Sequence, residues 1–448
     1  MIFKTFKKGG VHPKESKITA ETPAIKAPLP QKAVFPLAQH IGAPAVAVVK
    51  KGDKVKVGTV IAQSGGFVSA PIHSSVSGTV LKISDEITAS GYHHPAITIN
   101  VEGDEWEENI DRSDKIERLE NHKDLSPEEI KTRIQNAGIT GMGGASFPTH
   151  VKLAPPKDAK AECVILNGAE CEPFITADHR LMLEHAEEII IGLQLLMKAS
   201  GVEKGYIGIE NNKQDAIDLL TEKAKNNANI EIVALKVKYP QGGEKQLIDA
   251  VMKREVPAPP AIPIAVGAIV QNVATAFAVY EAVMKNKPLV ERYTTVSGNK
   301  ITEPKNLIVR LGTTTDFLLN ICGMLPENED NKILNGGPMM GKALLNTSVP
   351  ITKGTNAITV LSGKEAHRGE IRPCIRCAKC VNVCPMGLEP YLLAKCSCAK
   401  LWEFVDKNDI TICIECGSCQ FACPSNRPLL DLIRLGKSTV MAMKRKKQ

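Results

Sequence analysis

Eight cysteines near the end of the 448-residue chain have the spacing that holds iron–sulfur clusters. They form two runs of the pattern C-x-x-C-x-x-C-x-x-x-C-P, from Cys374 to Pro385 and from Cys413 to Pro424. Three thiolates at steps of three on a tight loop can hold three corners of a [4Fe–4S] cube. The fourth thiolate, on a following helical turn, points at the other cube. The two runs therefore predict a segment that carries electrons.

The same spacing predicts which cysteines share a cluster. One set is Cys374, Cys377, Cys380 and Cys423, and the other is Cys413, Cys416, Cys419 and Cys384. Zinc and a disulfide framework are the alternatives, but two fourfold runs that each end in proline exceed what a tetrahedral zinc site needs. The segment resembles a bacterial two-cluster ferredoxin. The remaining cysteines are interpreted as structural: Cys163, Cys171, Cys322, Cys396 and Cys398.

The chain is too long for a ferredoxin alone and predicts three or four domains. Its start has positive charge but no apolar core of a secretory signal, so we expect a cytoplasmic protein with reduced thiols. Residues 261–280 carry no charge, yet their polar residues and many alanines favour a buried strand and helix over a membrane span. The basic end MKRKKQ is either solvated or in contact with an acidic partner or anionic lipid. Nothing favours nucleic-acid binding.

Short strands punctuated by glycine and proline are predicted from Val46 to Ile99. The phrases KKGDKVKVGTVIA and APIHSSVSGTVLKI resemble the two halves of a barrel-sandwich domain of the biotinyl or lipoyl type. The turn that would present a modified lysine there contains His73, Ser74 and Ser75 instead. We therefore expect a docking or structural module without a swinging arm. The ten histidines show no metal spacing and are expected on the surface.

The middle of the chain alternates strands and helices. After a helix that begins at Ser126 and stops at Gly138, we expect a strand at 163–166, a helix at 177–200, a strand at 206–210, a helix at 213–226 and a strand at 230–237. Helix resumes after Gly243. This order predicts a Rossmann-like parallel sheet, whose ligands lie at the carboxyl ends of the strands. Residues 294–362 are β-rich with one helix, and no catalytic side chain is expected there.

Four stretches lie where such a sheet would bring loops together: 141–152, 167–173, 239–245 and 270–275. The glycines of the first could admit a phosphate to backbone N–H groups, with Lys152 as countercharge, or could form only a turn. The second offers Asn167 and two carboxylates, or only a solvated loop. The third opens a helix, where N–H groups are free. In the fourth, buried amides need either backbone or ligand partners.

In this order the four stretches resemble the flavin-binding subunit of respiratory complex I, of the 51-kilodalton type. That subunit holds FMN and admits NADH on similar GxGGxxFPT, NxxExEP, tyrosine–glycine and NVxT segments. The resemblance implies an FMN cradle with NADH beside it, and the cofactor-binding residues it implies are Gly141, Gly143, Gly144, Lys152, Asn167, Glu170, Glu172, Tyr239, Gly242, Gly243, Glu244 and Asn272. Glu170, Glu172 and Glu244 would lie near flavin and nicotinamide. No protein acid or base is expected to be catalytic, because the cofactor performs the chemistry.

The chain departs from that subunit at both ends, and its whole order resembles the RnfC component of the Rnf electron transport complex. The resemblance implies a multidomain α/β and β protein with these parts: a barrel-sandwich hybrid at 1–115, a Rossmann-like FMN and NADH domain at 116–290, an SLBB β-grasp domain at 291–364, a two-cluster ferredoxin-type helical domain at 365–435 and a basic tail at 436–448.

The resemblance further implies an oxidoreductase subunit that exchanges hydride with NAD(H) at FMN and single electrons through two [4Fe–4S] clusters. Its partners would be the membrane subunits and the ferredoxin-like iron–sulfur subunit of an ion-translocating ferredoxin:NAD⁺ oxidoreductase. It would lie peripherally on the cytoplasmic face of the cell membrane. Two rivals stay open at this point: a cobalamin reductase of a propanediol-utilising microcompartment, and an electron-relay or scaffold protein without active flavin.

Overall fold

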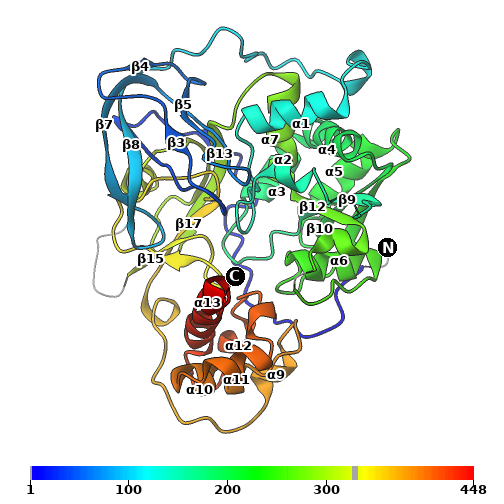
Figure 1. Ribbon diagram of the computed structural model, residues 1–448, viewed down its shortest axis with the longest axis vertical. Helices are drawn as coiled ribbons and strands as arrows, with labels where there is room; N and C mark the ends of the chain where they lie inside the picture. Colours follow the sequence, from blue (N-terminus) through cyan, green and yellow to red (C-terminus); the bar gives the residue numbers. More distant parts are fainter. Residues whose placement is uncertain (1–2, 157, 260, 325–330, 448) are drawn as a thin grey trace.

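The computed structural model describes residues 3–156, 158–259, 261–324 and 331–447. Some residues of the predicted domain ranges lie outside the described residues: 1–2, 157, 260, 325–330 and 448. Figure 1 shows a barrel at the upper left, a parallel-sheet domain at the right, a second sheet between them, and a cluster of helices at the lower end. The predicted multidomain α/β and β architecture is confirmed.

The parallel-sheet domain contains four parallel strands in the order β11-β10-β9-β12. Their bounds are Cys163–Gly168 for β9, Lys204–Glu210 for β10, Ile230–Leu235 for β11 and Ala268–Asn272 for β12. Side chains alternate between two buried faces, so Val164 and Leu166 join one core while Cys163 and Ile165 join another. Because β9 and β12 are neighbours, Asn167 and Asn272 stand side by side at their carboxyl ends.

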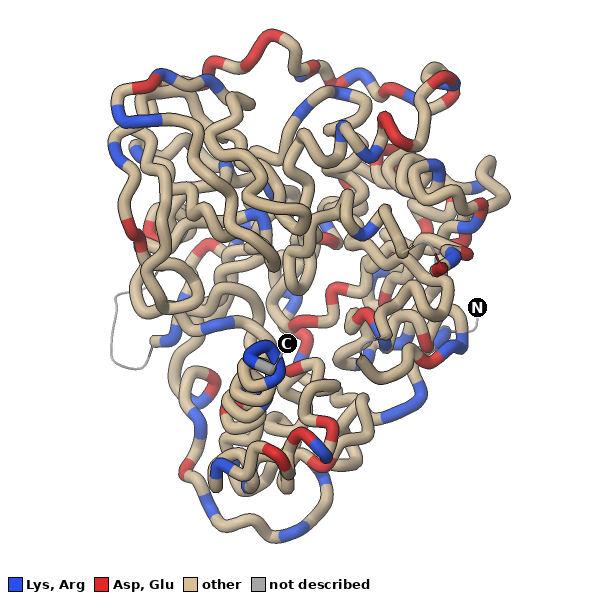
Figure 2. The backbone as a smooth tube through the Cα atoms, in the orientation of Figure 1, with Lys and Arg blue, Asp and Glu red and all other residues tan. Residues whose placement is uncertain are grey.

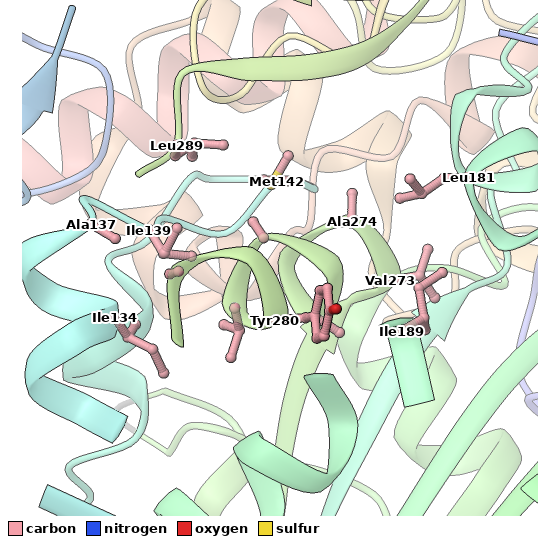
Figure 3. Close-up of a cluster of buried hydrophobic side chains, with 14 of the residues drawn as sticks. Ile134, Ala137, Ile139, Met142, Leu181, Ile189, Val273, Ala274, Tyr280 and Leu289 are labelled. Carbon is pink, nitrogen blue, oxygen red and sulfur yellow. The ribbon is translucent and has the colours of Figure 1, made fainter. Parts of the chain in front are cut away.

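Helices cover both faces of this sheet. On one face are α3, α4, α5 and α7, and on the other is α6. Figure 3 shows the apolar side chains of α7 between those of α1, α3 and α4, with Ile134, Leu181 and Ile189 turned toward it. Gly192 lets α4 approach α7, since a Cβ there would lie 2.0 Å from the Ala276 carbonyl oxygen. The helix bounds are Pro127–Asn136 (α1), Thr149–Lys152 (α2), Ala177–Glu184 (α3), Ala186–Ser200 (α4), Gln214–Ala224 (α5), Glu244–Met252 (α6) and Val273–Met284 (α7).

The helix predicted over 177–200 is two helices, because the chain breaks at His185 (φ −133°, ψ 40°). The His185 ring lies 2.9 Å from a Glu188 carboxylate oxygen and 3.0 Å from the Tyr293 hydroxyl. These tertiary contacts stabilise a helix break at a position that has neither proline nor glycine. The expectation of surface histidines was also wrong in part, since His73 and His179 are buried.

The barrel domain has a four-stranded sheet, β2-β8-β7-β4, and a three-stranded sheet, β3-β5-β6. The predicted turn between Pro71 and Val76 is packed inside the molecule, where the Ser75 hydroxyl donates to the Leu311 carbonyl of the neighbouring domain. A buried turn cannot act as a swinging arm. The bounds are Lys32–Pro36 (β2), Val46–Ala47 (β3), Lys54–Val55 (β4), Val60–Gln63 (β5), Ile72–His73 (β6), Ser77–Ile87 (β7) and His93–Gly103 (β8).

The sheet between these domains has six strands in the order β1-β14-β13-β17-β15-β16, and we call it the β-grasp domain. Its first strand, β1, comes from the N-terminal segment before the barrel and pairs in parallel with β14. The bounds are Ile25–Lys26 (β1), Glu291–Gly298 (β13), Lys305–Arg310 (β14), Thr315–Ile321 (α8), Lys332–Asn335 (β15), Lys342–Ala343 (β16) and Ala357–Leu361 (β17).

The cysteine-rich domain is helical. Its helices enclose an apolar core that includes Leu393, Val405, Ile410 and Ile433. Within the described residues, no helix combines the length and apolar character needed to cross a bilayer. The helices are Lys379–Asn382 (α9), Pro390–Cys398 (α10), Trp402–Lys407 (α11), Ser418–Phe421 (α12) and Leu429–Lys447 (α13), and short 3₁₀ turns lie at Leu119–Asn121, Pro263–Val266, Gly363–Glu365 and Ile410–Ile412.

Lys353 joins three of the domains. This fully buried side chain comes from the β-grasp domain, and its ammonium donates to the Pro71 carbonyl of the barrel (2.6 Å) and the Gly138 carbonyl after α1 (2.8 Å). Burial lowers the pKa of Lys353 from 10.5 to about 7. The side chain therefore meets two carbonyl groups that would otherwise lack a donor.

Replacing Lys353 by Met should destabilise the fold by roughly 2 kcal/mol near neutral pH, since two buried carbonyls lose their donor. The pKa falls from 10.5 when unfolded to about 7 when folded, so the native protein binds fewer protons in this window. Wild-type stability therefore rises with pH between these values. The Met variant lacks that rise, so its deficit should be larger near pH 9.5 than near pH 7. Urea unfolding followed by circular dichroism measures both values.

The matched control is Lys56→Met in the barrel domain, which removes an exposed ion pair with Glu105 and should change stability little. A deficit of Lys353→Met that is the same at both pH values would contradict the burial of its ammonium.

Candidate functional site

The carboxyl edge of the parallel sheet brings the predicted asparagines together. The Asn272 amide donates to an Asp178 carboxylate oxygen (2.7 Å) and to the Asn167 carbonyl (3.4 Å). Its carbonyl oxygen accepts from the Ala274 N–H and so caps α7. The Asn167 amide donates to the Gly242 carbonyl (2.8 Å). The second, third and fourth predicted stretches therefore meet at this edge.

The glycine-rich loop, residues 141–148, lies over the same edge. A Cβ on Gly143 would lie 3.4 Å from the Asn272 amide nitrogen, and a Cβ on Gly144 (φ 71°) would meet no atom within 4 Å. Met142 holds the loop from two sides, since its N–H donates to the Thr275 hydroxyl (3.0 Å) and its carbonyl accepts from Arg292 (2.7 Å). The loop is thus anchored at Met142 and open at Gly144.

Lys152 and Glu244 form an ion pair across the site. The Lys152 ammonium donates to a Glu244 carboxylate oxygen and to the Val270 carbonyl, each at 2.7 Å. Glu244 is the first residue of α6, after Gly243 as N-cap. The predicted countercharge is therefore the last residue of α2, and it is paired with the first residue of α6.

The two predicted carboxylates of the second stretch have different surroundings. Glu170 accepts from the Asp178 N–H (2.7 Å) and the His179 N–H (3.2 Å) at the start of α3. Glu172 accepts from the Met339 N–H (3.0 Å) and the Met340 N–H (2.7 Å). The loop at 336–341 thus reaches the site from the β-grasp domain, where the sequence had suggested no such role.

Sequence reasoning missed three residues and one loop that shape this site. The Lys17 ammonium donates to the carbonyls of Glu170, Glu172 and Ile175, at 2.6, 2.9 and 2.7 Å. Arg292 holds Met142, and Asp178 accepts from Asn272. The Gly336–Gly337 pair was the available signal for the Met339 loop, since a Cβ on Gly337 would lie 2.4 Å from Glu172. Lys17 and Arg292 carried no sequence signal.

Burial dominates the electrostatics of the site. Burial raises the pKa of Glu172 to about 7. The two backbone N–H donors and the charge of Lys17 have the opposite, smaller effect on this pKa. Burial and the charge of Glu170 raise the pKa of Asp178 to about 7. Burial also lowers the pKa of Arg292 to about 10. The site therefore contains carboxyl groups that exchange protons near neutral pH.

Tyr239 connects this site to the cysteine-rich domain. Its buried hydroxyl donates to the Cys416 carbonyl (2.8 Å), while its backbone exchanges two hydrogen bonds with Val11. Burial raises the pKa of Tyr239, so the hydroxyl keeps its proton. Next to it, the Cys171 sulfur accepts from the Gly242 N–H (3.4 Å). The third stretch therefore lies against one of the two cysteine loops.

The structure brings together the four cysteines of the second predicted set, and a cavity lies among them: Cys384, Cys413, Cys416 and Cys419. Burial, followed by the neighbouring thiols, raises the pKa of Cys419. Backbone N–H groups of Leu388 and Glu415 donate to the Cys384 and Cys413 sulfurs, each at 3.4 Å. Apolar side chains complete the lining. Thiols around a cavity, with N–H···S bonds and an apolar shell, fit an iron–sulfur cluster.

The first predicted set is more exposed. Cys423 is close enough to Cys380 to raise the pKa of Cys380, after burial, and Cys374 and Cys377 are exposed. All thirteen cysteines are free thiols in the structure. Among the described residues, no three His, Cys, Asp or Glu side chains could share a single metal ion.

The cysteines outside the two runs differ in burial. Cys163, Cys322 and Cys396 are packed in apolar clusters, as expected for structural residues. Cys398, at the end of α10, is exposed, and packing does not explain it.

Comparison with protein families accounts for most of the chain. Residues 4–104 match the RnfC barrel sandwich hybrid domain, residues 134–281 the Nuo51 FMN-binding domain and residues 293–343 the SLBB domain. A relative from Acetobacterium woodii, the RnfC component of a Na(+)-translocating ferredoxin:NAD(+) oxidoreductase complex, is 44% identical over 98% of both chains. The chain belongs to the RnfC family.

Two further relatives agree with this membership. The corresponding component of the proton-translocating ferredoxin:NAD(+) oxidoreductase complex of Clostridium ljungdahlii is 48% identical over 88% of this RnfC chain and 84% of its own. Its counterpart in the ion-translocating oxidoreductase complex of Rhodobacter capsulatus is 41% identical over 86% of this chain and 74% of its own length. A solved NAD⁺-reducing [NiFe]-hydrogenase shares the fold, with a TM-score of 0.51 and 19% identity over 70% of this chain and 63% of that one.

Arg292→Lys should weaken FMN binding about tenfold, or ~1.4 kcal/mol. The guanidinium donates to both the Met142 and Lys353 carbonyls, and one ammonium cannot replace both contacts. The glycine-rich loop would then lose one of its two anchors. Quenching of FMN fluorescence on titration with flavin-free protein measures the affinity.

The control is Arg254→Lys, which alters an exposed contact with Glu162 and should leave FMN affinity unchanged. Unchanged affinity in a correctly folded Arg292→Lys protein would show that Arg292 does not position the loop.

Proposed function

We propose that this chain is the NADH-oxidising RnfC component of an ion-translocating ferredoxin:NAD⁺ oxidoreductase. It exchanges hydride with NAD(H) at FMN and single electrons through two [4Fe–4S] clusters. The observation that supports the proposal is the hydrogen bond from Tyr239 to Cys416, which joins the residues at the sheet edge to a cysteine loop that lines a cavity. The names of the relatives and the FMN-binding domain family support the same activity.

The residues at the sheet edge fit FMN, which when bound accepts a hydride and passes electrons on singly. Gly144 leaves open space beside its backbone, and the first turn of α6 offers N–H groups to an anion. We assign FMN contacts to Gly141, Gly143, Gly144, Lys152, Asn167, Tyr239, Gly242, Gly243 and Asn272. Glu170, Glu172 and Glu244 would shape the place where the nicotinamide enters.

The cluster assignment follows the two cysteine sets. We assign Cys384, Cys413, Cys416 and Cys419 to an inner cluster, because Cys416 touches Tyr239. Cys374, Cys377, Cys380 and Cys423 would hold an outer cluster, because two of these thiols are exposed. Cys384 and Cys423 thus cross between the runs, and this keeps the two clusters close.

The relatives' names describe one component of a complex of several subunits. We propose that the chain binds the membrane subunits and the iron–sulfur subunit of that complex, peripherally on the cytoplasmic face. The five domain ranges predicted from the sequence are part of the same proposal. Neither a cobalamin reductase nor a flavin-free scaffold is favoured by these names.

Anaerobically purified protein should contain FMN and about eight irons, and NADH should bleach the flavin. Cys384→Ser and Cys423→Ser should each remove about four irons, but with different consequences. In the Cys423 variant the inner cluster remains and should be reduced after NADH addition at the wild-type rate. In the Cys384 variant only the outer cluster remains, and its reduction should be much slower. Iron analysis and freeze-quench electron paramagnetic resonance measure both effects.

Each cysteine variant is the control for the other, because the same atom is changed in the equivalent position. The reverse order of effects would overturn the crossed assignment. Protein that binds iron but no FMN, even after reconstitution, would overturn the proposed function.

Glu172→Gln should slow flavin bleaching by NADH while FMN content is retained. The nicotinamide gains positive charge as it gives up hydride, and an ionised carboxylate nearby stabilises that charge. Since the pKa of Glu172 is about 7, the wild-type rate should rise as pH increases through this value. The Gln variant should show a flat profile at the lower rate. Stopped-flow absorbance at several pH values measures it.

Glu162→Gln, at an exposed ion pair, serves as the control and should retain the wild-type profile. Equal loss of flavin content and of rate in Glu172→Gln would count against a role beside the nicotinamide.

A further inference from the structure

The two cysteine loops are structural copies of each other, thirty-nine positions apart. The outer loop reads CIRCAKC from Cys374, and the inner loop reads CIECGSC from Cys413. The backbones match, since Arg376 and Glu415 both have φ 57°, and Ala378 and Gly417 both have positive φ. Equivalent positions in the two loops can therefore be compared directly.

The inner copy is covered. Ile414 packs beside Val11 and Tyr239, at the start of the third predicted stretch. Two further apolar residues near this loop, Ile410 and Leu430, are 0% and 5% exposed. The inner loop and its neighbours therefore form an internal interface with the parallel-sheet domain. Under the proposed function, this domain supplies the electrons.

The outer copy presents the equivalent residues to solvent. Ile371, Ile375 and Tyr391 correspond to Ile410, Ile414 and Leu430, and they are 51%, 67% and 41% exposed. Residues 367–379 are exposed throughout, including Cys374 and Cys377. Apolar side chains beside exposed cluster ligands mark a surface that another protein can cover.

Charge distinguishes the two copies as well. Glu415 in the inner loop is paired with Arg434 (3.2 Å) and Lys437 (2.9 Å). The outer loop has Arg376 and Lys379 instead, and within the described residues neither forms an ion pair. Residues 371–448 contain thirteen Lys and Arg and six Asp and Glu, so this segment has a net charge of +7. The whole chain has the same net charge, +7. Figure 2 shows blue segments along the loop at the lower end of the molecule.

We propose that an acidic electron-transfer protein docks on this outer face, formed by Ile371, Ile375, Arg376, Lys379 and Tyr391. The inference rests on the proposed function, because it takes the outer cysteines as cluster ligands. The apolar residues supply a desolvated centre, and the unpaired cations attract and orient an acidic partner. The partner's redox centre is thereby brought beside Cys374 and Cys377. We choose an iron–sulfur protein over a lipid surface because the inner copy of the loop already serves a protein interface.

The test replaces the outer cations by the residues of the inner loop, Arg376→Glu and Lys379→Ser. Glu415 shows that Glu adopts the backbone conformation of Arg376. The probe is a purified acidic two-cluster ferredoxin, and its binding to the reconstituted full chain is followed by biolayer interferometry at increasing salt. The double variant should bind at least about tenfold more weakly at low salt, with a smaller salt dependence. The control, Arg445→Glu with Lys446→Ser at the exposed end of α13, has the same charge change and should bind within about threefold of wild type.

Equal ferredoxin affinity of wild type and the outer-loop variant would overturn the proposal. A control variant that loses as much affinity as the outer-loop variant would overturn it too. Vesicles of phosphatidylcholine and phosphatidylglycerol form a second arm. In one outcome, the vesicles are bound through Arg376 and Lys379 while the ferredoxin is not bound. That result would assign the face to a lipid surface and would also overturn the proposal. Iron and FMN contents of the same samples report separately on the proposed function, so its failure is distinguishable from failure of docking.

Discussion

A hydrogen bond from the Tyr239 hydroxyl to the Cys416 carbonyl seats the cysteine-rich domain against the parallel sheet. The proposed electron transfer between a flavin at the sheet edge and a cluster in the cysteine-rich domain requires the two to be neighbours. Tyr239 is buried, and its own backbone is paired with Val11 of the N-terminal segment. The contact is therefore held from both sides, and it selects the inner cysteine loop rather than the outer one.

Three cations that bind backbone carbonyls, the half-buried Lys17 and the buried Arg292 and Lys353, hold the remaining parts in place. Lys17 gathers three carbonyls of the loop at 170–175, Arg292 bonds the glycine-rich loop, and Lys353 joins the barrel to the segment after α1. A buried cation without partners is costly, so Arg292 and Lys353 each require the correct arrangement of several domains at once. The site is thus assembled from distant segments whose positions depend on each other.

Much of the fold was predictable from local patterns. The strand at Cys163 and the helix start at Ser126 follow from apolar runs and capping residues, and the strand and helix predicted within 261–280 are found at 268–284. Other features were not predictable. The break at His185 depends on Tyr293, more than a hundred positions away, and β1 pairs with a strand from another domain. Such contacts have no local sequence signal, because their partners are distant in the chain.

The sequence by itself determined which residues could do chemistry: cysteines at cluster spacing, a glycine-rich loop and asparagines at strand ends. These depend on residue type and short-range spacing, which are set before the chain folds. Only the tertiary structure decided which cysteine loop packs against Tyr239, that Glu172 meets Met339 and Met340, and that Ile375 and Arg376 stay uncovered. Two loops with the same cysteine spacing have different surroundings because only one packs against Tyr239, and packing is a property of the whole fold.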